Sequence, residues 1–178
     1  MCRGATMIES AACKRRGKLP RPFNTPLECG LRLLFVLAAC RPARCDLQRL
    51  ISYDYLLVHS GDVENGPESL HPAVPDRGAE WVVKRDLVQT GMDLMFAREL
   101  VTKQLTADGI TYVGSEMTSA FIGLLKTPYA TEMQKRAGWI VDTFGTRTDD
   151  EVQAFMAERV GAWGTEFETL AAIGDIEV

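Results

Sequence analysis

The chain has 178 residues, 46% hydrophobic and 25% charged, which fits one ordinary globular domain and excludes a disordered chain, a collagen-like repeat and a disulfide-stapled miniprotein. Its 20 basic and 24 acidic residues give a net charge of -4. This balance argues against a general nucleic-acid binder, because such proteins gain most of their affinity by neutralising phosphates.

The beginning of the chain differs from the rest in charge. Residues 1–23 hold six basic residues and one acidic residue, which leaves 14 basic and 23 acidic residues, a net charge of -9, on the remainder. We interpret residues 1–22 as a basic, disordered extension, or as residues upstream of a second start at Met7. They lack the apolar core and cleavage site of a signal peptide.

Two helices with clear amino-terminal caps are predicted next. Thr25, Pro26 and Glu28 form a capping box, and apolar residues at helical spacing follow it up to residue 40. Asp46 caps a second helix, which we expect to end at His59.

A loop rich in proline and glycine, residues 59–78, separates the second helix from the third. Twenty residues are many for a loop inside a compact domain, and such loops often carry function. We expect the loop to be ordered, because its prolines restrict the unfolded chain and because His59, Glu68 and His71 can fix it.

The third helix is predicted over about residues 80–97. Trp81, Met92, Met95 and Phe96 are expected in the core. Gly91 lies within this helix and is expected to weaken it by about 1 kcal/mol relative to alanine.

The hydrophobic period changes after the third helix. Two strand-like runs, 100–106 and 110–115, are joined by Ala107-Asp108-Gly109, a hairpin signal that requires a positive φ at Gly109. Further helices are predicted over about 118–125, from Thr127-Pro128 to Gly145, and after a Thr148–Glu151 capping box.

The order of elements predicts a mostly α protein of the α+β class. We expect a winged-helix-like core with one β-hairpin over residues 23–145, and a C-terminal helix and acidic tail over 146–178 packed on the same domain. In DNA-reading helix-turn-helix proteins, a turn of about three or four residues precedes the recognition helix. The corresponding connection here is about twenty residues, and the third helix carries balanced charge. These features favour protein contact, with a DNA-binding winged-helix regulator as the alternative.

The cysteines bear on metal binding and cellular compartment, and the apolar runs bear on whether the chain could span a membrane. The five cysteines form no CxxC pair, and with only two histidines they fit no zinc pattern. Reduced thiols indicate the cytoplasm. The longest apolar run, residues 33–40, is far shorter than the ~20 residues that span a bilayer. We therefore expect a soluble cytoplasmic protein without a metal or a membrane segment.

Several segments resemble one family. Phe23-Asn24-Thr25-Pro26-Leu27-Glu28 is similar to the start of the middle components of bacterial ABC-three-component conflict systems. The resemblance continues through the runs 46–50, 54–62 and 66–72, and through the third helix to residue 145; the His-Ser-Gly-Asp and Leu-His-Pro segments are its most specific parts.

The resemblance implies a function. Such systems, including Lamassu-type antiviral defence, pair an SMC/Rad50-like ATPase with an effector, often a nuclease, and their middle component is a small helical adaptor. It therefore implies a non-enzymatic adaptor that binds the ATPase and the effector, meets DNA only through the complex, and needs no cofactor. No catalytic residues come with this family.

One region of the chain is dense in reactive side chains, namely Asp54, His59, Ser60, Asp62, Glu68 and His71. If these residues are catalytic, a histidine oriented by Asp54 would activate Ser60 as a nucleophile. If their role is structural instead, His59 would end the second helix and His71 would fix the loop. We favour the structural interpretation, and the chain has no phosphate-binding loop motif either.

The candidate site residues are therefore assigned to a partner interface or to anchoring of the loop: Tyr53, Asp54, Tyr55, His59, His71 and Trp81. Asp54 falls on an apolar stripe, where a carboxylate needs a partner. We expect backbone N–H groups, or an arginine such as Arg49 or Arg85, to supply it, with a partner protein as the alternative. Trp139, Trp163 and Phe167 are weaker candidates for an apolar contact surface.

Overall fold

Helices dominate the computed structural model, which describes residues 25–72, 77–107 and 109–159, without the side chains of 77–83. The α-helices are α1 (Pro26–Cys40), α2 (Leu47–Val58), α3 (Arg77–Phe96), α4 (Glu116–Gly123) and α5 (Pro128–Phe144), and residues 149–159 form a further helix. A 3-10 turn, η1 (Ser60–Asp62), follows α2. The strands are β1 (Cys45–Asp46), β2 (Val101–Thr106) and β3 (Gly109–Gly114). The predicted α+β class is confirmed. The predictions for residues 1–22 and for the acidic tail lie outside the described residues.

The predicted helix starts are confirmed by their hydrogen bonds. The Glu28 N–H donates to Thr25 Oγ1 (3.2 Å), and the Arg49 N–H donates to Asp46 Oδ1 (2.6 Å). Thr148 and Glu151 satisfy one another reciprocally at the start of the last helix, at 3.2 and 2.7 Å. Each bond removes a backbone donor that would otherwise lack a partner.

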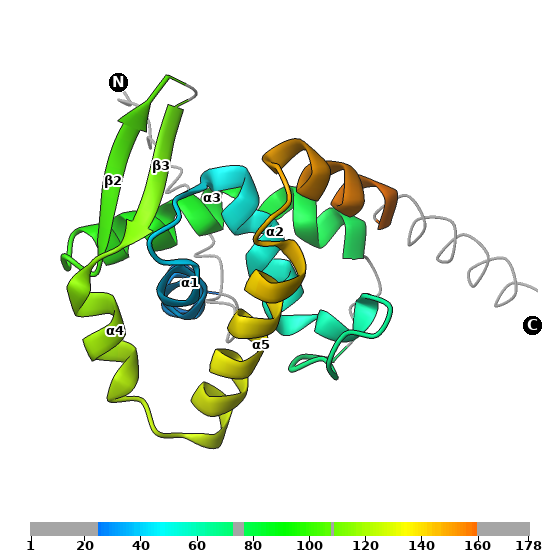
Figure 1. Cartoon of the computed structure of the whole chain (residues 1–178), viewed down its shortest axis with the longest axis horizontal. Helices are drawn as coiled ribbons and strands as arrows, with labels where there is room; N and C mark the ends of the chain where they lie inside the picture. Colours follow the sequence, from blue (N-terminus) through cyan, green and yellow to red (C-terminus); the bar gives the residue numbers. More distant parts are fainter. Residues whose placement is uncertain (1–24, 73–76, 108, 160–178) are drawn as a thin grey trace, which may run out of the picture.

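Helix α1 is the centre of the domain, and Figure 1 looks almost along its axis, with α4 on one side and α5 on the other. It packs most extensively on α3, and the two backbones meet at Gly30 and Gly91. A Cβ on Gly91 would lie 2.6 Å from the Pro26 carbonyl oxygen, closer than a real contact allows. Gly91 is therefore required for this helix crossing, and its description as a weak point of α3 was incomplete.

The position of the hairpin and the positive φ predicted for Gly109 are confirmed, although Gly109 is the first residue of β3 and Asp108 lies outside the described residues. Strands β2 and β3 are antiparallel and pair from Val101–Gly114 to Thr106–Gly109, and Gly109 has a φ of +126°. The two-residue strand β1, which the sequence analysis missed, pairs with β3 to give the sheet order β1-β3-β2. The far end of the hairpin projects from the helices at the upper left of Figure 1.

Some of the residues predicted to lie in the core are buried and one is not. Met92 and Met95 are fully buried as expected, but Phe96 is 46% exposed. Phe96 closes α3 at the domain edge, where the Lys103 ammonium lies 4.8 Å from its ring centroid. The side chains of Trp81, Trp163 and Phe167 lie outside the described residues. In the part of the chain that the structure describes, no helix has both the length and the apolarity needed to cross a membrane.

Candidate functional site

An ion cluster buried at the junction of three helices contains Asp54 of α2. Arg32 of α1 donates to both carboxylate oxygens of Asp54, from Nε to Oδ1 at 2.8 Å and from Nη2 to Oδ2 at 3.0 Å. Lys84 Nζ of α3 lies 3.3 Å from Oδ2. Asp54, Arg32 and Lys84 are 0%, 1% and 3% exposed. The prediction that Asp54 needs a partner was right, but the partners are Arg32 and Lys84 rather than backbone N–H groups, Arg49 or Arg85.

The charges of the cluster determine its protonation. Burial raises the pKa of Asp54, but the positive charges of Lys84 and Arg32 outweigh it and lower that pKa to about 2. The Asp54 charge likewise outweighs burial at Arg32 and raises its pKa. Burial, reinforced by the Asp54 charge, raises the pKa of the adjacent Cys29 thiol. At neutral pH Asp54 and Arg32 are therefore ionised and Cys29 is a neutral thiol.

The cluster fixes three helices relative to one another rather than presenting a reactive group. Its bidentate arginine–carboxylate contact defines both distance and orientation between α1 and α2. Glu28, 3.4 Å from Arg32 Nη1 and one-third exposed, connects the cluster to the surface. Arg32 is a charged residue inside the apolar run of α1, and this signal could have identified it from the sequence, but the sequence analysis did not use it.

The segment after α2 is anchored to α2 by side-chain and backbone hydrogen bonds. Tyr55 Oη donates to Asp62 Oδ2 at 2.5 Å, and Ser60 Oγ donates to the Glu68 carbonyl at 3.2 Å. The N–H groups of Leu70 and His71 both donate to the Val58 carbonyl, at 2.9 and 3.0 Å. Residues 59–72 are therefore held against α2, whereas 73–76 lie outside the described residues, and the order of the whole loop 59–78 stays a prediction.

Helix α5 holds the same segment from its other side. The guanidinium of Arg136 donates to the Glu68 carbonyl from Nε and Nη2, at 3.0 and 2.6 Å. Its Nη1 also donates to Glu132 Oε2 at 2.6 Å. The sequence analysis did not identify Arg136, because the contact joins residues 68 positions apart.

The two histidines have different surroundings. His59 ends α2 as predicted, its N–H donating to the Tyr55 carbonyl at 2.9 Å, and it is 2% exposed. His71 Nε2 lies 2.9 Å from Tyr129 Oη of α5 and the two rings are stacked, with centroids 6.3 Å apart. Burial, and then the charge of Arg32, lower the pKa of His71. His71 is therefore a neutral residue that joins the loop to α5.

The two tyrosines proposed as partner contacts are buried. Tyr53 and Tyr55 are 1% and 0% exposed, because α2 is covered by helices on its sides and by the anchored loop at its end. Tyr53 Oη receives a bond from Arg49 Nη1 (2.9 Å), and Arg49 also pairs with Asp149 at the last helix. The assignment of Tyr53 and Tyr55 to a partner surface is therefore corrected: Tyr53 is a core residue, and Tyr55 anchors the loop.

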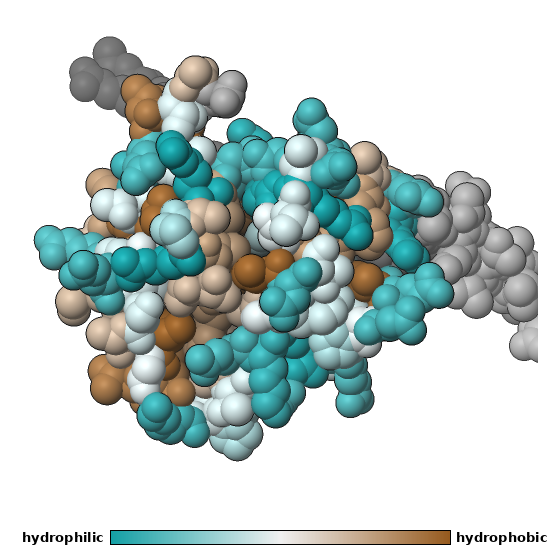
Figure 2. Space-filling view, in the orientation of Figure 1, coloured by the Kyte–Doolittle hydropathy of each residue, from teal (hydrophilic) through white to brown (hydrophobic). Residues whose placement is uncertain are grey.

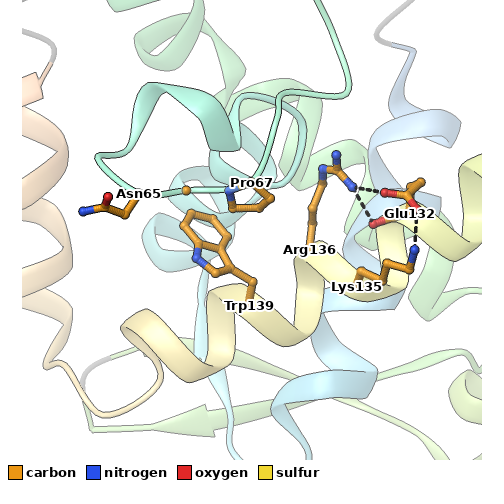
Figure 3. A pocket seen from close by; sticks show the side chains of 7 residues that line it. Asn65, Pro67, Glu132, Lys135, Arg136 and Trp139 are labelled. Carbon is orange, nitrogen blue, oxygen red and sulfur yellow. Dashed lines mark hydrogen bonds and ion pairs between the residues drawn. The ribbon is translucent and has the colours of Figure 1, made fainter.

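A shallow hollow of about 390 Å³ lies between the loop and α5 (Figure 3). Pro67 and Trp139 face each other across it, and Glu132, Lys135 and Arg136 line its other end. Glu132 pairs with Lys135 Nζ at 2.7 Å as well as with Arg136, so these charges are largely satisfied among themselves. Across the described ranges, no group of three or more His, Cys, Asp or Glu side chains is placed to hold a metal ion.

A comparison with protein families identifies the class of protein. Residues 22–166 match the model of the ABC-three component (ABC-3C) system Middle Component 2 family, so the chain belongs to that family and is a middle component of such a system. The match includes the C-terminal helix, which the resemblance noted from the sequence did not reach. No curated protein and no solved structure matches the chain significantly.

Proposed function

We propose that this middle component is a non-enzymatic adaptor, which links an SMC/Rad50-like ATPase to an effector in a Lamassu-like antiviral defence complex. Family membership supports joint action with the other components of an ABC-three-component system. The observation that carries the adaptor role is the use of the reactive side chains: Asp54, His59 and Ser60 are all at most 2% exposed and serve the scaffold. Free thiols at Cys29, Cys40 and Cys45 are in keeping with a cytoplasmic location.

We further propose that the core is a winged helix used for protein contact. The supporting observations are the element order α1-β1-α2-α3-β2-β3 and a sheet in which β3 lies between β1 and β2. The hairpin is then the wing. Leu105 and Ile110, which pair across its strands near the turn, are 86% and 51% exposed. An exposed apolar pair on a projecting hairpin is a surface that a protein partner would bury.

Two cations of the elements that would contact DNA, one on α3 and one on the hairpin, are engaged within the protein. Lys84 of α3 is buried against Asp54, and Lys103 of β2 pairs with Asp93 at 2.5 Å. A DNA-binding winged helix would use this helix and this hairpin to contact phosphates. The arrangement therefore favours the adaptor over the DNA-binding regulator.

Co-purification tests the adaptor role. The tagged protein is expressed with the ATPase and effector encoded beside it, and captured at about 0.1 M salt. We expect both to be retained, and Leu105→Asp to reduce retention of at least one by about tenfold or more, because it places a charge in the apolar contact. Thr102→Asp, an exposed change on the opposite face of the hairpin, is the matched control. If the wild-type protein elutes without either folded component, the adaptor proposal is wrong.

An electrophoretic shift assay of the isolated protein on duplex DNA addresses the alternative. Binding that weakens steeply between about 50 and 200 mM salt would indicate several phosphate contacts and favour the regulator. We expect no such binding.

A further inference from the structure

Helix α4 has an outward face that no other part of the described chain covers. The one fully buried residue of α4 is Thr118, whose Oγ1 donates to the Leu100 carbonyl, while Phe121 and Ile122 are partly buried against the core. On the outward side, Met117 is 59% exposed and Leu124, at the end of the helix, is 78% exposed. Figure 2 shows apolar surface over α4, at the lower left.

These outward residues form a continuous stripe. Met117, Ala120 and Leu124 are spaced i, i+3 and i+7, which places them on one side of a helix. The small side chain of Ala120 at the centre permits close approach of a second helix. The stripe is therefore shaped for helix–helix packing.

Charge lies at the two ends of this segment and nowhere between them. Residues 117–125 contain no Asp, Glu, Lys or Arg; Glu116 precedes them and Lys126 follows them. Both flanking side chains are exposed. A complementary helix must therefore present an apolar stripe with a cation opposite Glu116 and an anion opposite Lys126, and an antiparallel copy of α4 has this pattern.

We propose that the outward face of α4 is a self-association surface, whose occupant is α4 of a second copy of this chain. A two-fold axis beside Ala120 places Met117 of each copy over Leu124 of the other, and Ala120 against Ala120. The same axis brings Glu116 of each copy within reach of Lys126 of the other, so the contact forms two equivalent ion pairs. Such a closed, self-complementary contact is the usual form of a homodimer interface.

The size of the surface determines how strong the association is. A standard interface uses about 20–30 residues on each side, whereas α4 and the residues after it offer roughly ten. We therefore expect a reversible dimer with a Kd in the range of about 1–100 µM rather than a permanent one. This inference goes beyond the proposed adaptor role, because that role concerns binding to the ATPase and the effector rather than to a second copy of this chain.

Sedimentation equilibrium of the full chain between about 5 and 200 µM tests the inference. The wild type should dimerise, and Leu124→Ser should remain monomeric. Lys126→Glu should weaken dimerisation about tenfold, the equivalent of ~1.4 kcal/mol, because it turns two attractive pairs into repulsive ones. The double exchange Glu116→Lys with Lys126→Glu should restore association to within about threefold. Leu105→Ser, at a hairpin position that is also largely exposed, is the control and should dimerise like the wild type.

Thermal unfolding of each variant is measured beside the sedimentation to check that the variant is folded. Leu124→Ser, at an exposed position, provides a test that does not depend on the charge changes. The inference is overturned by a wild-type monomer at 200 µM, by dimerisation that Leu124→Ser leaves unchanged, or by a folded double exchange that associates no better than Lys126→Glu. None of these outcomes affects capture of the ATPase and effector, which tests the adaptor role separately.

Discussion

Replacing Asp54 with asparagine removes the central charge of the buried ion cluster while almost preserving the size of the side chain. Arg32 and Lys84 would stay buried without the carboxylate that both contact at 2.8–3.3 Å. The neutral amide resembles the protonated carboxyl group, so the pKa of Asp54 provides a scale for the effect. Its lowering from 3.8 to about 2 corresponds to roughly 2 kcal/mol in favour of the charged form.

The full loss on Asp54→Asn should exceed this value, because removing one partner of a buried ion pair typically costs about 3–5 kcal/mol. We expect a loss of between about 2 and 5 kcal/mol in the free energy of unfolding. For a domain of this size, this corresponds to a decrease in Tm of about 5–20 °C. The matched control is Asp93→Asn, the same change at an exposed pair with Lys103, which should cost less than about 1 kcal/mol.

The assay is urea unfolding followed by circular dichroism, repeated at several pH values. The folded-state pKa of Asp54 lies below its ordinary value, so its stabilisation is present above about pH 4 and is lost as the pH falls through about 2. The difference between the wild type and Asp54→Asn should therefore decrease as the pH approaches 2. A loss at pH 7 no larger than that of Asp93→Asn would refute the claim that the cluster holds the three helices together.

Three further changes test other contacts. Gly91→Ala should destabilise the domain by about 2 kcal/mol or more, because its Cβ would meet the Pro26 carbonyl at 2.6 Å, whereas Gly138→Ala, with nothing within 4 Å, should be neutral or stabilising in thermal unfolding. Equal effects of these two changes would contradict the close crossing of α1 and α3. Gly109→Val should cost about 1–3 kcal/mol, because its φ of +126° is strained for a β-branched residue, and an unchanged Tm would count against the turn geometry. Tyr55→Phe should cost about 1 kcal/mol and speed proteolytic cleavage within 61–72, because it removes the bond to Asp62; cleavage at the wild-type rate would show that the loop is held by other contacts.

Local signals predicted the elements well. Thr25, Asp46 and Thr148 each accept a hydrogen bond from the backbone N–H three residues later, so a short stretch of sequence is enough to predict these helix starts. The hairpin strands are likewise close in sequence, with Thr106 paired to Gly109. The third helix begins at Arg77, about three residues before its predicted start, in a region without a comparable cap signal. Strand β1 was missed because two residues carry no periodicity, and only pairing with β3 defines it.

The site was harder to predict because its contacts are long-range. The sequence indicated that Asp54 needs a partner, but Arg32 is 22 residues away and lies within an apolar run, so it was not considered. Aromatic content alone could not separate anchors from exposed contacts: Tyr53 and Tyr55 are buried, while Tyr129 is 42% exposed and binds His71. Which face of α2 is covered depends on α1, α3 and α5 together, and that arrangement is not encoded in any one segment.

Helix α2 has a further consequence for genetics. Nine consecutive residues, Leu50 to Val58, are buried, so beyond its first turn the helix has no face on which a substitution could act by contact alone. Loss-of-function mutations that map there should lower the amount of folded protein rather than its affinity for partners, and growth at lower temperature should rescue many of them. Mutations that abolish activity at normal abundance should instead map to peripheral positions such as the hairpin and α4. A screen that records protein level beside the activity of the ABC-three-component system would separate the two classes without any purified component.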